Sequence, residues 1–369
     1  RRVLIKVGSG VLAGGNGIDL EIIENLADEI ALLSRRGIQC VLVSSGAVAS
    51  GKSRMSVTGA LKSLPQKQAA AAVGQGILMD AYSKAFARHG LVVAQMLLTM
   101  SDLVDRHRYL NIRNTLSALM EWKVVPIINE NDTVSVEEIK FGDNDNLAAM
   151  MANVMEAELL INLTNTEGLY DCNPRLFPEK ACFIPLVREI TDEIEACTTA
   201  DADPLGTGGM KSKVMAARKV TAFGIPCIIG PGKLKGVLEN IFEGLETGTL
   251  FLPMETHMSS RKYWIAFTLR SRGKLFIDDG AADAIIGKGK SLLPSGVTGV
   301  EGVFSTGDPV TCFDSKGTAI AKGLVNYSSA DIEKIKGLKT SKIEQVLGSK
   351  PYDEVIHRDN MAVSKLSKQ

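Results

Sequence analysis

The order of apolar segments predicts an α/β protein with an open, mainly parallel sheet and a second, smaller domain. Short apolar runs alternate with segments of helical periodicity over roughly the first 250 residues. That alternation is typical of a sheet covered by helices on both faces, a three-layer α/β/α fold. After Pro253 the chain changes to short strand-like runs separated by Gly, Pro and Asp, which predicts a small, mainly-β domain of barrel type. A length of 369 residues also exceeds one typical core.

The strands of the first domain are expected at apolar runs, and the helices where apolar residues recur every three or four positions. The expected strands are 3–7, 38–44, 91–98, 124–128, 158–163 and 225–229. The expected helices are 20–33, 66–89, 110–122, 146–156, 210–223 and 234–245. Ligands bind at the carboxyl ends of parallel strands. The segments that should meet at this edge of the sheet are 8–10, 44–46, 129–132 and 164–165.

The second domain has a different pattern, in which short strands dominate. The strand-like runs are 264–269, 274–278, 309–313 and 319–325, with one short helix near 281–287. The expected divisions of the chain are a first domain over 1–253, a linker over 254–267, the small domain over 268–350 and a polar C-terminal tail over 351–369.

The composition narrows the class of protein. Lys plus Arg equals Asp plus Glu, 42 each, so no overall field selects a nucleic acid or an acidic membrane. No apolar run approaches the roughly 18 residues that a membrane helix requires, and the first residues lead into a strand instead of a signal peptide. Cys40 and Cys227 lie in apolar strand patterns, which favours buried free thiols in a reducing cytoplasm. Four scattered histidines give no metal-ligand spacing.

Polar residues are concentrated in residues 126–146, PIINENDTVSVEEIKFGDNDN. Residues 129–132 follow an apolar strand, and residues 143–146 stand directly before an apolar helix pattern. Carboxylates can hold an ammonium group, and amides supply paired donors and acceptors, so this density suits a small zwitterion. Turns and helix N-caps also use Asn and Asp, but one cap needs one such residue, and here the two clusters hold eight acidic or amide residues, seven of them Asn or Asp.

Two glycine motifs match the sequence patterns of nucleotide-binding loops, but neither is followed by the helix that these loops require. Residues 46–53 fit the P-loop expression G-x-x-x-x-G-K-[ST], yet no clear helix follows, so a P-loop NTPase is the minor alternative. Residues 8–13 fit G-x-G-x-x-[GA] after a strand, but Gly14, Gly15 and Gly17 follow where a helix should begin. Both motifs still place glycines at strand ends, where backbone N–H groups can approach phosphate oxygens.

A third glycine-rich loop, 206–213, stands before an expected helix. A turn of this kind can bind an anion, and Lys211 and Lys213 add positive charge; an ordinary solvated loop is the alternative. Lys6 interrupts an apolar strand, where an unpaired ammonium group is costly. A phosphate beside Gly8 would compensate for that cost, as would extension of the side chain to the edge of the sheet.

Six segments together resemble the amino acid kinase family, in particular its members that phosphorylate glutamate. They are KVGSGVL (6–12), VLVSSGAVASG (41–51), VPIINENDTV (125–134), EIKFGDNDNLAA (138–149), LTNTEGLYDCNPR (163–175) and GTGGMKSKVMAA (206–217). No single segment is decisive, but six in order at family-like spacing are specific, and the resemblance covers the whole chain. The part from about 268 to 350 is similar to a PUA domain, a module that otherwise occurs in RNA-modifying proteins.

The resemblance implies the amino acid kinase fold and a role for each site residue. Lys6 and Lys213 would hold the phosphates and stabilise the transferring group, and Asp145 would fix the positions of both lysines. The amino acid would bind at Ser45, Asn129, Asp132, Asp143 and Asn144. ATP would bind at Lys6, Gly8, Ser9, Thr164, Asn165, Thr207, Gly208, Gly209, Met210, Lys211, Ser212 and Lys213. The chain departs from the family at Asn165, where the usual residue is Asp, so a charge near the nucleotide is missing.

The implied reaction is the ATP-dependent phosphorylation of the γ-carboxylate of L-glutamate to γ-glutamyl phosphate, the first step of proline biosynthesis. That carboxylate is already ionised at pH 7, so no general base is required. The protein has to align two anions and neutralise the transferring phosphoryl group. Mg²⁺ would be held mainly by the nucleotide phosphates and water, with no protein ligand assigned.

The resemblance also implies partners, and it leaves alternatives. The labile product would pass to γ-glutamyl phosphate reductase, proline would act as a feedback inhibitor, and the chain would form a homo-oligomer, a dimer or a tetramer. The alternatives are a kinase acting on N-acetylglutamate, aspartate or a nucleoside monophosphate, and a PUA-type RNA-binding protein. The acidic and amide clusters suit a free ammonium group better than an acetylated one. Residues 256–369 carry 17 Lys and Arg against 12 Asp and Glu, a small surplus for RNA binding.

Overall fold

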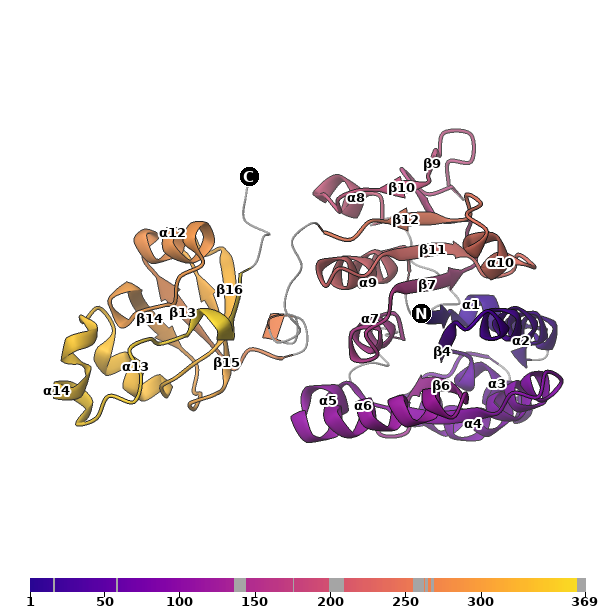
Figure 1. The fold of residues 1–369 in the computed structure, drawn as a ribbon, viewed down its shortest axis with the longest axis horizontal. Coiled ribbons are helices and arrows are strands. Elements are labelled where there is room, and N and C mark those ends of the chain that lie inside the picture. The colour runs from indigo at the N-terminus through magenta and orange to yellow at the C-terminus, as the bar shows by residue number, and fades with distance from the viewer. Residues whose placement is uncertain are drawn as a thin grey trace. The chain divides into compact units, whose positions relative to one another are not determined.

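The computed structural model describes residues 1–15, 17–57, 59–135, 144–174, 176–198, 209–254, 262, 265–266 and 269–363. The chain divides into two compact units, Arg1–His257 and Met258–Gln369, each with its own hydrophobic core (Figure 1). The finer limits expected for the domains and the linker stay a prediction. No helix within the described ranges is long and apolar enough to cross a membrane.

An eight-stranded sheet forms the centre of the first unit. In spatial order, its strands are β10 (Leu186–Val187), β12 (Thr249–Phe251), β11 (Cys227–Pro231), β7 (Leu159–Thr164), β1 (Arg2–Val7), β4 (Gln39–Ser44), β6 (Val125–Glu130) and β5 (Val93–Leu98). The strands from β11 to β5 pair in parallel, whereas β12 pairs antiparallel with β11 and parallel with β10. The prediction of an open, mainly parallel sheet is confirmed.

Helices cover both faces of this sheet, which confirms the three layers. One core cluster joins the sheet to α2 (Leu20–Arg35), α4 (Leu64–Ala87) and α10 (Val237–Phe242). The other cluster joins it to α6 (Arg106–Glu121), α7 (Asn144–Val154) and α9 (Met210–Ala222), and Figure 1 shows α7 and α9 as neighbours. Cys40 and Cys227 lie in these clusters as free, buried thiols, as predicted.

Shorter elements connect these layers. The short helices are α1 (Ser9–Leu12), α3 (Ala47–Arg54), α5 (Met100–Val104) and α8 (Asp192–Ala196). Two small hairpins are formed by β2 (Ala13–Gly14) with β3 (Gly17–Ile18), and by β8 (Leu169–Tyr170) with β9 (Phe183–Ile184). α1 begins two residues after β1, and α3 begins three residues after β4.

The alternation of side chains along β1 decides which layer each residue faces. Val3, Ile5 and Val7 belong to the cluster with α2 and α4, whereas Leu4 belongs to the cluster with α7 and α9. Successive side chains of a strand point to opposite faces of the sheet. Lys6 therefore lies on the face of Leu4, toward α7 and α9, where it is 4% exposed.

The second unit contains a five-stranded sheet. Its strands in spatial order are β14 (Val297–Glu301), β13 (Gly273–Ile277), β15 (Pro309–Phe313), β16 (Ala319–Leu324) and β17 (Met361–Val363). The core of this unit also takes side chains from α12 (Asp279–Lys288), α13 (Ser329–Ile335) and α14 (Ile343–Leu347). The mainly-β second domain is thereby confirmed, and α12 is the short helix predicted near 281–287.

Two expectations for the second unit need correction. The strand expected over 264–269 is wrong at Ile265 and Ala266, where the backbone is π-helical. Of the polar tail expected over 351–369, Val355 and Ile356 are fully buried, and β17 pairs with β16 in the sheet. These apolar segments are two and three residues long, so no periodicity could reveal them, and their place depends on pairing with distant strands.

Candidate active site

Backbone hydrogen bonds align the carboxyl ends of the central strands at one edge of the sheet. The N–H of Gly8, after β1, donates to the carbonyl of Leu163 in β7 over 3.2 Å. The N–H of Ser45, after β4, donates to Val7 over 3.2 Å, and the N–H of Gly232, after β11, donates to Thr164 over 2.7 Å. The edge at which ligands bind in parallel sheets is therefore formed by segments that are far apart in the chain.

Three charged side chains from three elements meet at this edge, on the face that carries α7 and α9. Lys6 of β1 places its Nζ 2.6 Å from Oδ1 of Asp145, and Lys213 of α9 places its Nζ 3.2 Å from Oδ2 of the same carboxylate. The exposed fractions of the Lys6, Lys213 and Asp145 side chains are 5%, 7% and 1%. Two ammonium groups therefore share one carboxylate at a place that is almost closed to solvent.

Two further side chains complete the coordination of Asp145. Asn162 of β7 donates from Nδ2 to Oδ1 over 2.9 Å, and Ser212 of α9 donates from Oγ to Oδ2 over 2.5 Å. Burial alone would raise the pKa of Asp145, but the charges of Lys6 and Lys213 and the hydrogen bonds from Lys6 and Ser212 outweigh burial and hold this pKa below its usual range. Asp145 therefore stays ionised at neutral pH.

Asn162 is not among the site residues predicted from the sequence, although its position in the strand carries a signal. Asn162 interrupts an apolar strand as Lys6 does, and it lies opposite Lys6 in the pairing of β1 with β7. Two polar residues at matching positions of adjacent buried strands indicate a shared polar site. The pairing itself, however, is known only from the structure.

An amide cluster begins one residue before Asp145. Asn144, the first residue of α7, donates from Nδ2 toward Oγ of Ser45 over 3.0 Å and toward Oδ1 of Asn129 over 3.0 Å. Asn129 of β6 is 2% exposed and donates from its own Nδ2 to Oε1 of Gln75 in α4 over 2.8 Å. Because Asn144 and Asp145 are consecutive, the first turn of α7 joins the amide cluster to the lysine cluster.

The other polar residues of the 126–146 stretch separate into different roles. Asp132 follows β6, and burial raises its pKa to about 6. Glu130 is buried and accepts a hydrogen bond from Oγ of Ser135 over 2.9 Å, whereas Asn146 of α7 accepts one from Lys219 of α9 and so links these two helices. Asp143 lies outside the described residues.

The residues expected to bind the nucleotide are distributed around β1, β7 and the start of α9. Gly8 is the N-cap of α1, which begins at Ser9, and a Cβ added to Gly8 would lie 3.6 Å from Nζ of Lys6, so the backbone of this turn adjoins the ammonium group. Thr164 ends β7, and its Oγ1 donates to Oδ1 of Asn165 over 3.4 Å. Both segments therefore stand at the same edge as the lysine cluster.

The expected site residues at the start of α9 lie in two different environments, buried and exposed. Gly209 is the N-cap of α9, and Met210 is buried in the core cluster with α7. Lys211 is exposed, whereas Lys213 is buried against Asp145. The structure therefore assigns the two lysines different environments, although the sequence treated them alike. Thr207 and Gly208 lie outside the described residues.

The P-loop alternative does not fit the structure. Residues 47–53 form most of helix α3, and only Gly46, with φ 107°, precedes it as the N-cap. Gly51 lies inside this helix, where an added Cβ would be 1.8 Å from the carbonyl oxygen of Ala70 in α4. Gly74 of α4 makes the reciprocal approach to Ala47, at 1.8 Å. The second glycine of the motif therefore permits close helix packing, so it cannot form a phosphate loop.

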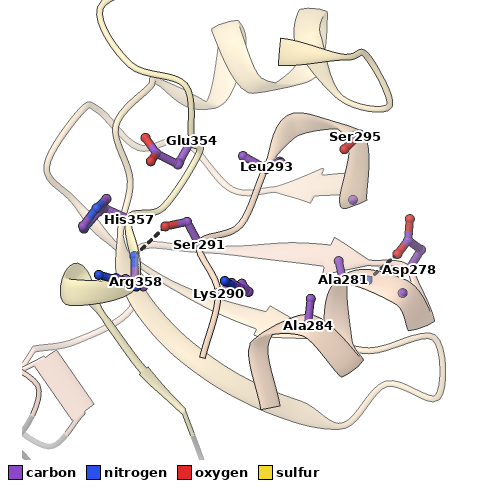
Figure 2. Close-up of a pocket in the computed structure, with 12 residues that line it drawn as sticks. Asp278, Ala281, Ala284, Lys290, Ser291, Leu293, Ser295, Glu354, His357 and Arg358 are labelled. Atoms are coloured by element: carbon purple, nitrogen blue, oxygen red, sulfur yellow. Dashed lines mark hydrogen bonds between the residues drawn. The ribbon is translucent and has the colours of Figure 1, made fainter. Parts of the chain in front are cut away.

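A separate hollow lies within the second unit, with a volume of about 740 Å³. Its walls combine two basic side chains, Lys290 and Arg358, with two acidic ones, Asp278 and Glu354, and with apolar side chains from α12 and Leu293. Figure 2 shows that Ser291 and Arg358 come from two distant segments of the chain, joined by a hydrogen bond of 3.0 Å from the N–H of Arg358 to Oγ of Ser291. The two basic and two acidic side chains leave this lining without an excess of positive charge.

Known families and proteins match both units. The amino acid kinase family matches residues 1–231, and the PUA domain matches residues 273–347. A glutamate 5-kinase of Syntrophus aciditrophicus is 67% identical over 369 residues, which are 100% of this chain and 96% of that protein. Glutamate 5-kinases of Trichlorobacter lovleyi and Syntrophotalea carbinolica are 52% and 50% identical, over 98% and 99% of this chain and 96% and 98% of those proteins.

Proposed function

This chain belongs to the amino acid kinase family, among its glutamate 5-kinases with a PUA domain, and we propose that it transfers the γ-phosphoryl group of ATP to the γ-carboxylate of L-glutamate. The product would be γ-glutamyl phosphate, in the first step of proline biosynthesis. The observation that carries this proposal is the meeting of Lys6 and Lys213 on Asp145, directly beside the amide cluster.

The lysine cluster supports phosphoryl transfer by electrostatics. Two ammonium groups share the carboxylate of Asp145, in a site where the three side chains are nearly fully buried. Charge develops on the equatorial oxygens of the transferring phosphoryl group, and preorganised positive charge stabilises it most where water is excluded. Asp145 would keep both ammonium groups in place, so that no reorganisation is needed when the phosphoryl group moves.

The amide cluster supports a small amino acid as the acceptor. Ser45 and Asn144 lie within hydrogen-bond distance of each other, and Asn129 joins them from β6. Asp132, with its raised pKa, would regain a normal pKa on pairing with a substrate ammonium group. The adjacent positions of Asn144 and Asp145 would place the γ-carboxylate of the bound amino acid beside the lysines. Asp143 is proposed as a neighbour of this subsite on family membership alone.

No general base is required, because the attacking γ-carboxylate has a pKa of about 4.3 and is ionised at neutral pH. The catalytic work is alignment of two anions and neutralisation of the charge between them. Lys6 and Lys213 would carry that neutralisation, and the backbone N–H groups of Ser9 and of the start of α9 would bind phosphate oxygens. Gly8 would only allow the phosphate to approach, because its own N–H donates to Leu163. The remaining members of the proposed ATP site are Thr164, Asn165, Thr207, Gly208, Gly209, Met210, Lys211 and Ser212.

The described part of the site offers no cluster of side chains that would bind Mg²⁺. Within the described ranges, no group of three or more His, Cys, Asp and Glu side chains is arranged to hold a metal ion. The carboxylate at the centre of the site, Asp145, already accepts from Lys6, Lys213, Asn162 and Ser212. We therefore assign the metal to the nucleotide phosphates and derive no step from a protein-bound ion.

Asn165 lacks the negative charge of the usual Asp. This difference concerns the binding of the nucleotide and leaves the class of reaction unchanged. An amide can still donate and accept hydrogen bonds, as the contact between Thr164 and Asn165 illustrates. We propose that the affinity or preference for the nucleotide differs from that of relatives with Asp at this position. Transfer of the labile product to a reductase, inhibition by proline and assembly into a dimer or tetramer rest on family membership alone.

The test of the main proposal is trapping of the acyl phosphate with hydroxylamine while the acceptor is varied. L-Glutamate should give a hydroxamate in the presence of MgATP, and N-acetylglutamate and aspartate should give far less. Omission of ATP is the blank. Equal formation of the hydroxamate from N-acetylglutamate would contradict the choice of a free amino acid.

A second function, RNA binding by the PUA unit, rests on the match to the PUA domain over residues 273–347, and it can be tested at the hollow between α12 and the segment before β17. Lys290 and Arg358 line this hollow, and phosphate contacts of basic side chains make RNA binding weaken steeply with salt. The full chain should then retain RNA at low salt and release it as salt rises, and reversal of charge at Lys290 should weaken retention. Retention that is unaffected by Lys290→Glu would remove the hollow as the RNA site.

A further inference from the structure

One backbone N–H group fixes the orientation of three side-chain amides at the substrate edge. The N–H of Glu130 donates to Oδ1 of Asn129 over 2.9 Å, so this position of the Asn129 amide must be the oxygen. Nδ2 of Asn129 is therefore a donor, and it faces Gln75 at 2.8 Å. The atom of Gln75 that receives this hydrogen bond must be Oε1. Gln75 is left with its Nε2 turned away from Asn129.

Two acceptor atoms fix the orientation of the Asn144 side-chain amide. Its amide contacts Oδ1 of Asn129 at 3.0 Å and the carbonyl oxygen of Ser44 at 3.1 Å, and both of these atoms are acceptors. The contacting atom must therefore be Nδ2. At one end of this chain of amides, Gln75 has a donor without a partner in the described part of the chain. At the other end, Asn144 has an acceptor without a partner there. Both atoms, Nε2 of Gln75 and Oδ1 of Asn144, are buried without a hydrogen-bond partner among the described residues.

A buried donor and a buried acceptor without partners are costly, so native proteins rarely leave them unsatisfied. An amino acid zwitterion supplies the matching pair, because its carboxylate accepts and its ammonium group donates. Nε2 of Gln75 can only donate, so it cannot hold the ammonium group. The chemistry of the open atom therefore selects an oxygen of the ligand.

We propose that Gln75 is a specificity-determining residue that donates a hydrogen bond from Nε2 to the α-carboxylate of the substrate. This inference rests on the proposed function, in which the γ-carboxylate lies at Lys6 and Lys213 and the α-carboxylate is the remaining acceptor. The position of Gln75 is set by its neighbour Gly74, whose lack of a side chain lets α4 pack closely against Ala47 of α3. Close packing of α4 on α3 holds the donor beside the segment that contains Ser45.

The substitution Gln75→Glu tests this role with little other change. It keeps an oxygen to accept from Asn129 and replaces only the open donor by a second oxygen. At pH 8 the KM for L-glutamate should rise roughly 10- to 100-fold, the range expected for loss of a hydrogen bond to a charged group. The turnover number and the KM for ATP should change by less than about 3-fold. Gln66→Glu is the matched control, because Gln66 is exposed at the N-terminus of the same helix and Glu also suits its capping position.

A substrate analogue separates α-carboxylate binding from a general loss of structure. 4-Aminobutyrate is glutamate without the α-carboxylate, so its inhibition constant against L-glutamate should stay within about 3-fold in the Gln75→Glu variant. Gln75→Met adds no charge but removes both the donor Nε2 and the acceptor of the Asn129 hydrogen bond; it should likewise weaken L-glutamate more than 4-aminobutyrate. Equal weakening of both compounds would make Gln75 a structural residue, and no weakening of either would mean that water satisfies Nε2; both results overturn the proposal. If the wild-type chain gave no hydroxamate with L-glutamate, the proposed function would fail first, independently of Gln75.

Discussion

Replacement of Asp145 by Asn should separate the structural and the catalytic work of the lysine cluster. The substitution preserves the shape of the side chain and removes one negative charge. It leaves the ammonium groups of Lys6 and Lys213, at 5% and 7% exposure, without the carboxylate that holds them at 2.6 and 3.2 Å. Removal of one partner of a buried ion pair costs about 3–5 kcal/mol. Folded domains are stable by roughly 5–15 kcal/mol, so the variant should lose a large part of its stability.

The same variant should respond unusually to the nucleotide. Phosphate groups would restore negative charge beside the two lysines, so MgATP should raise the melting temperature of Asp145→Asn more than that of the wild type. Turnover should nevertheless fall, because the ammonium groups lose the side chain that positions them. A displacement of about 1 Å in such a site can cost about 100-fold in rate. The expected pattern is therefore a lower kcat without a matching loss of ATP binding.

The assays are thermal melting with and without MgATP, urea unfolding, and hydroxamate formation under saturating substrates. Asp80→Asn is the control, because Asp80 pairs with Lys84 on the surface of α4, where both side chains are mostly exposed; such pairs contribute little. If Asp145→Asn unfolded at the wild-type urea concentration and retained its kcat within about 3-fold, the argument from buried charge would be refuted.

The pH dependence of this stabilisation has a definite sign. The pKa of Asp145 is lowered in the folded protein by Lys6 and Lys213, which outweigh its burial. A group of this kind stabilises the fold fully above its unfolded pKa and loses that contribution as the pH falls through the lower folded value. The difference in unfolding free energy between the wild type and Asp145→Asn should therefore stay constant from about pH 8 to pH 6 and shrink only in acid.

Three further predictions concern other parts of the first unit. Burial raises the pKa of Asp132 to about 6, so the KM for glutamate should fall as pH rises through 6, and Asp132→Asn should flatten that profile in steady-state assays; a flat wild-type profile would contradict this. Gly74→Ala should lower the free energy of unfolding by about 1–3 kcal/mol or more, because the added Cβ would overlap backbone atoms of α3. Gly76→Ala, two residues along the same helix, has open space around it and should raise the free energy of unfolding by about 0.5–1 kcal/mol, as measured by thermal melting. Lys52→Ala should retain kcat within about 2-fold while Lys6→Ala loses at least about 100-fold, and the reverse result would restore the P-loop alternative.

The polar residues show where sequence reasoning succeeded and where it could not. Lys6 was recognisable because an ammonium group inside an apolar strand needs a partner, and the structure supplies Asp145. Asn162 carried the same signal, but its meaning depended on the pairing of β7 with β1. Gln75 gave no signal, since a glutamine in a helix is ordinary until the atoms around it are known. The density of Asn and Asp near 126–146 indicated a site, but it did not distinguish Asn144 from Glu130, which bonds locally to Ser135.

The sequence by itself determined the order of the layers and the edge of the sheet at which polar segments collect. Periodicity acts over a few residues, and the rule for parallel sheets then places every strand end on one side. Only the tertiary structure decided that Lys6 and Lys213 share one carboxylate, that residues 46–53 form a helix packed through Gly51 and Gly74, and that the last strand belongs to the second core. Those outcomes depend on the register and packing of elements that are distant in the chain, and local periodicity carries no information about them.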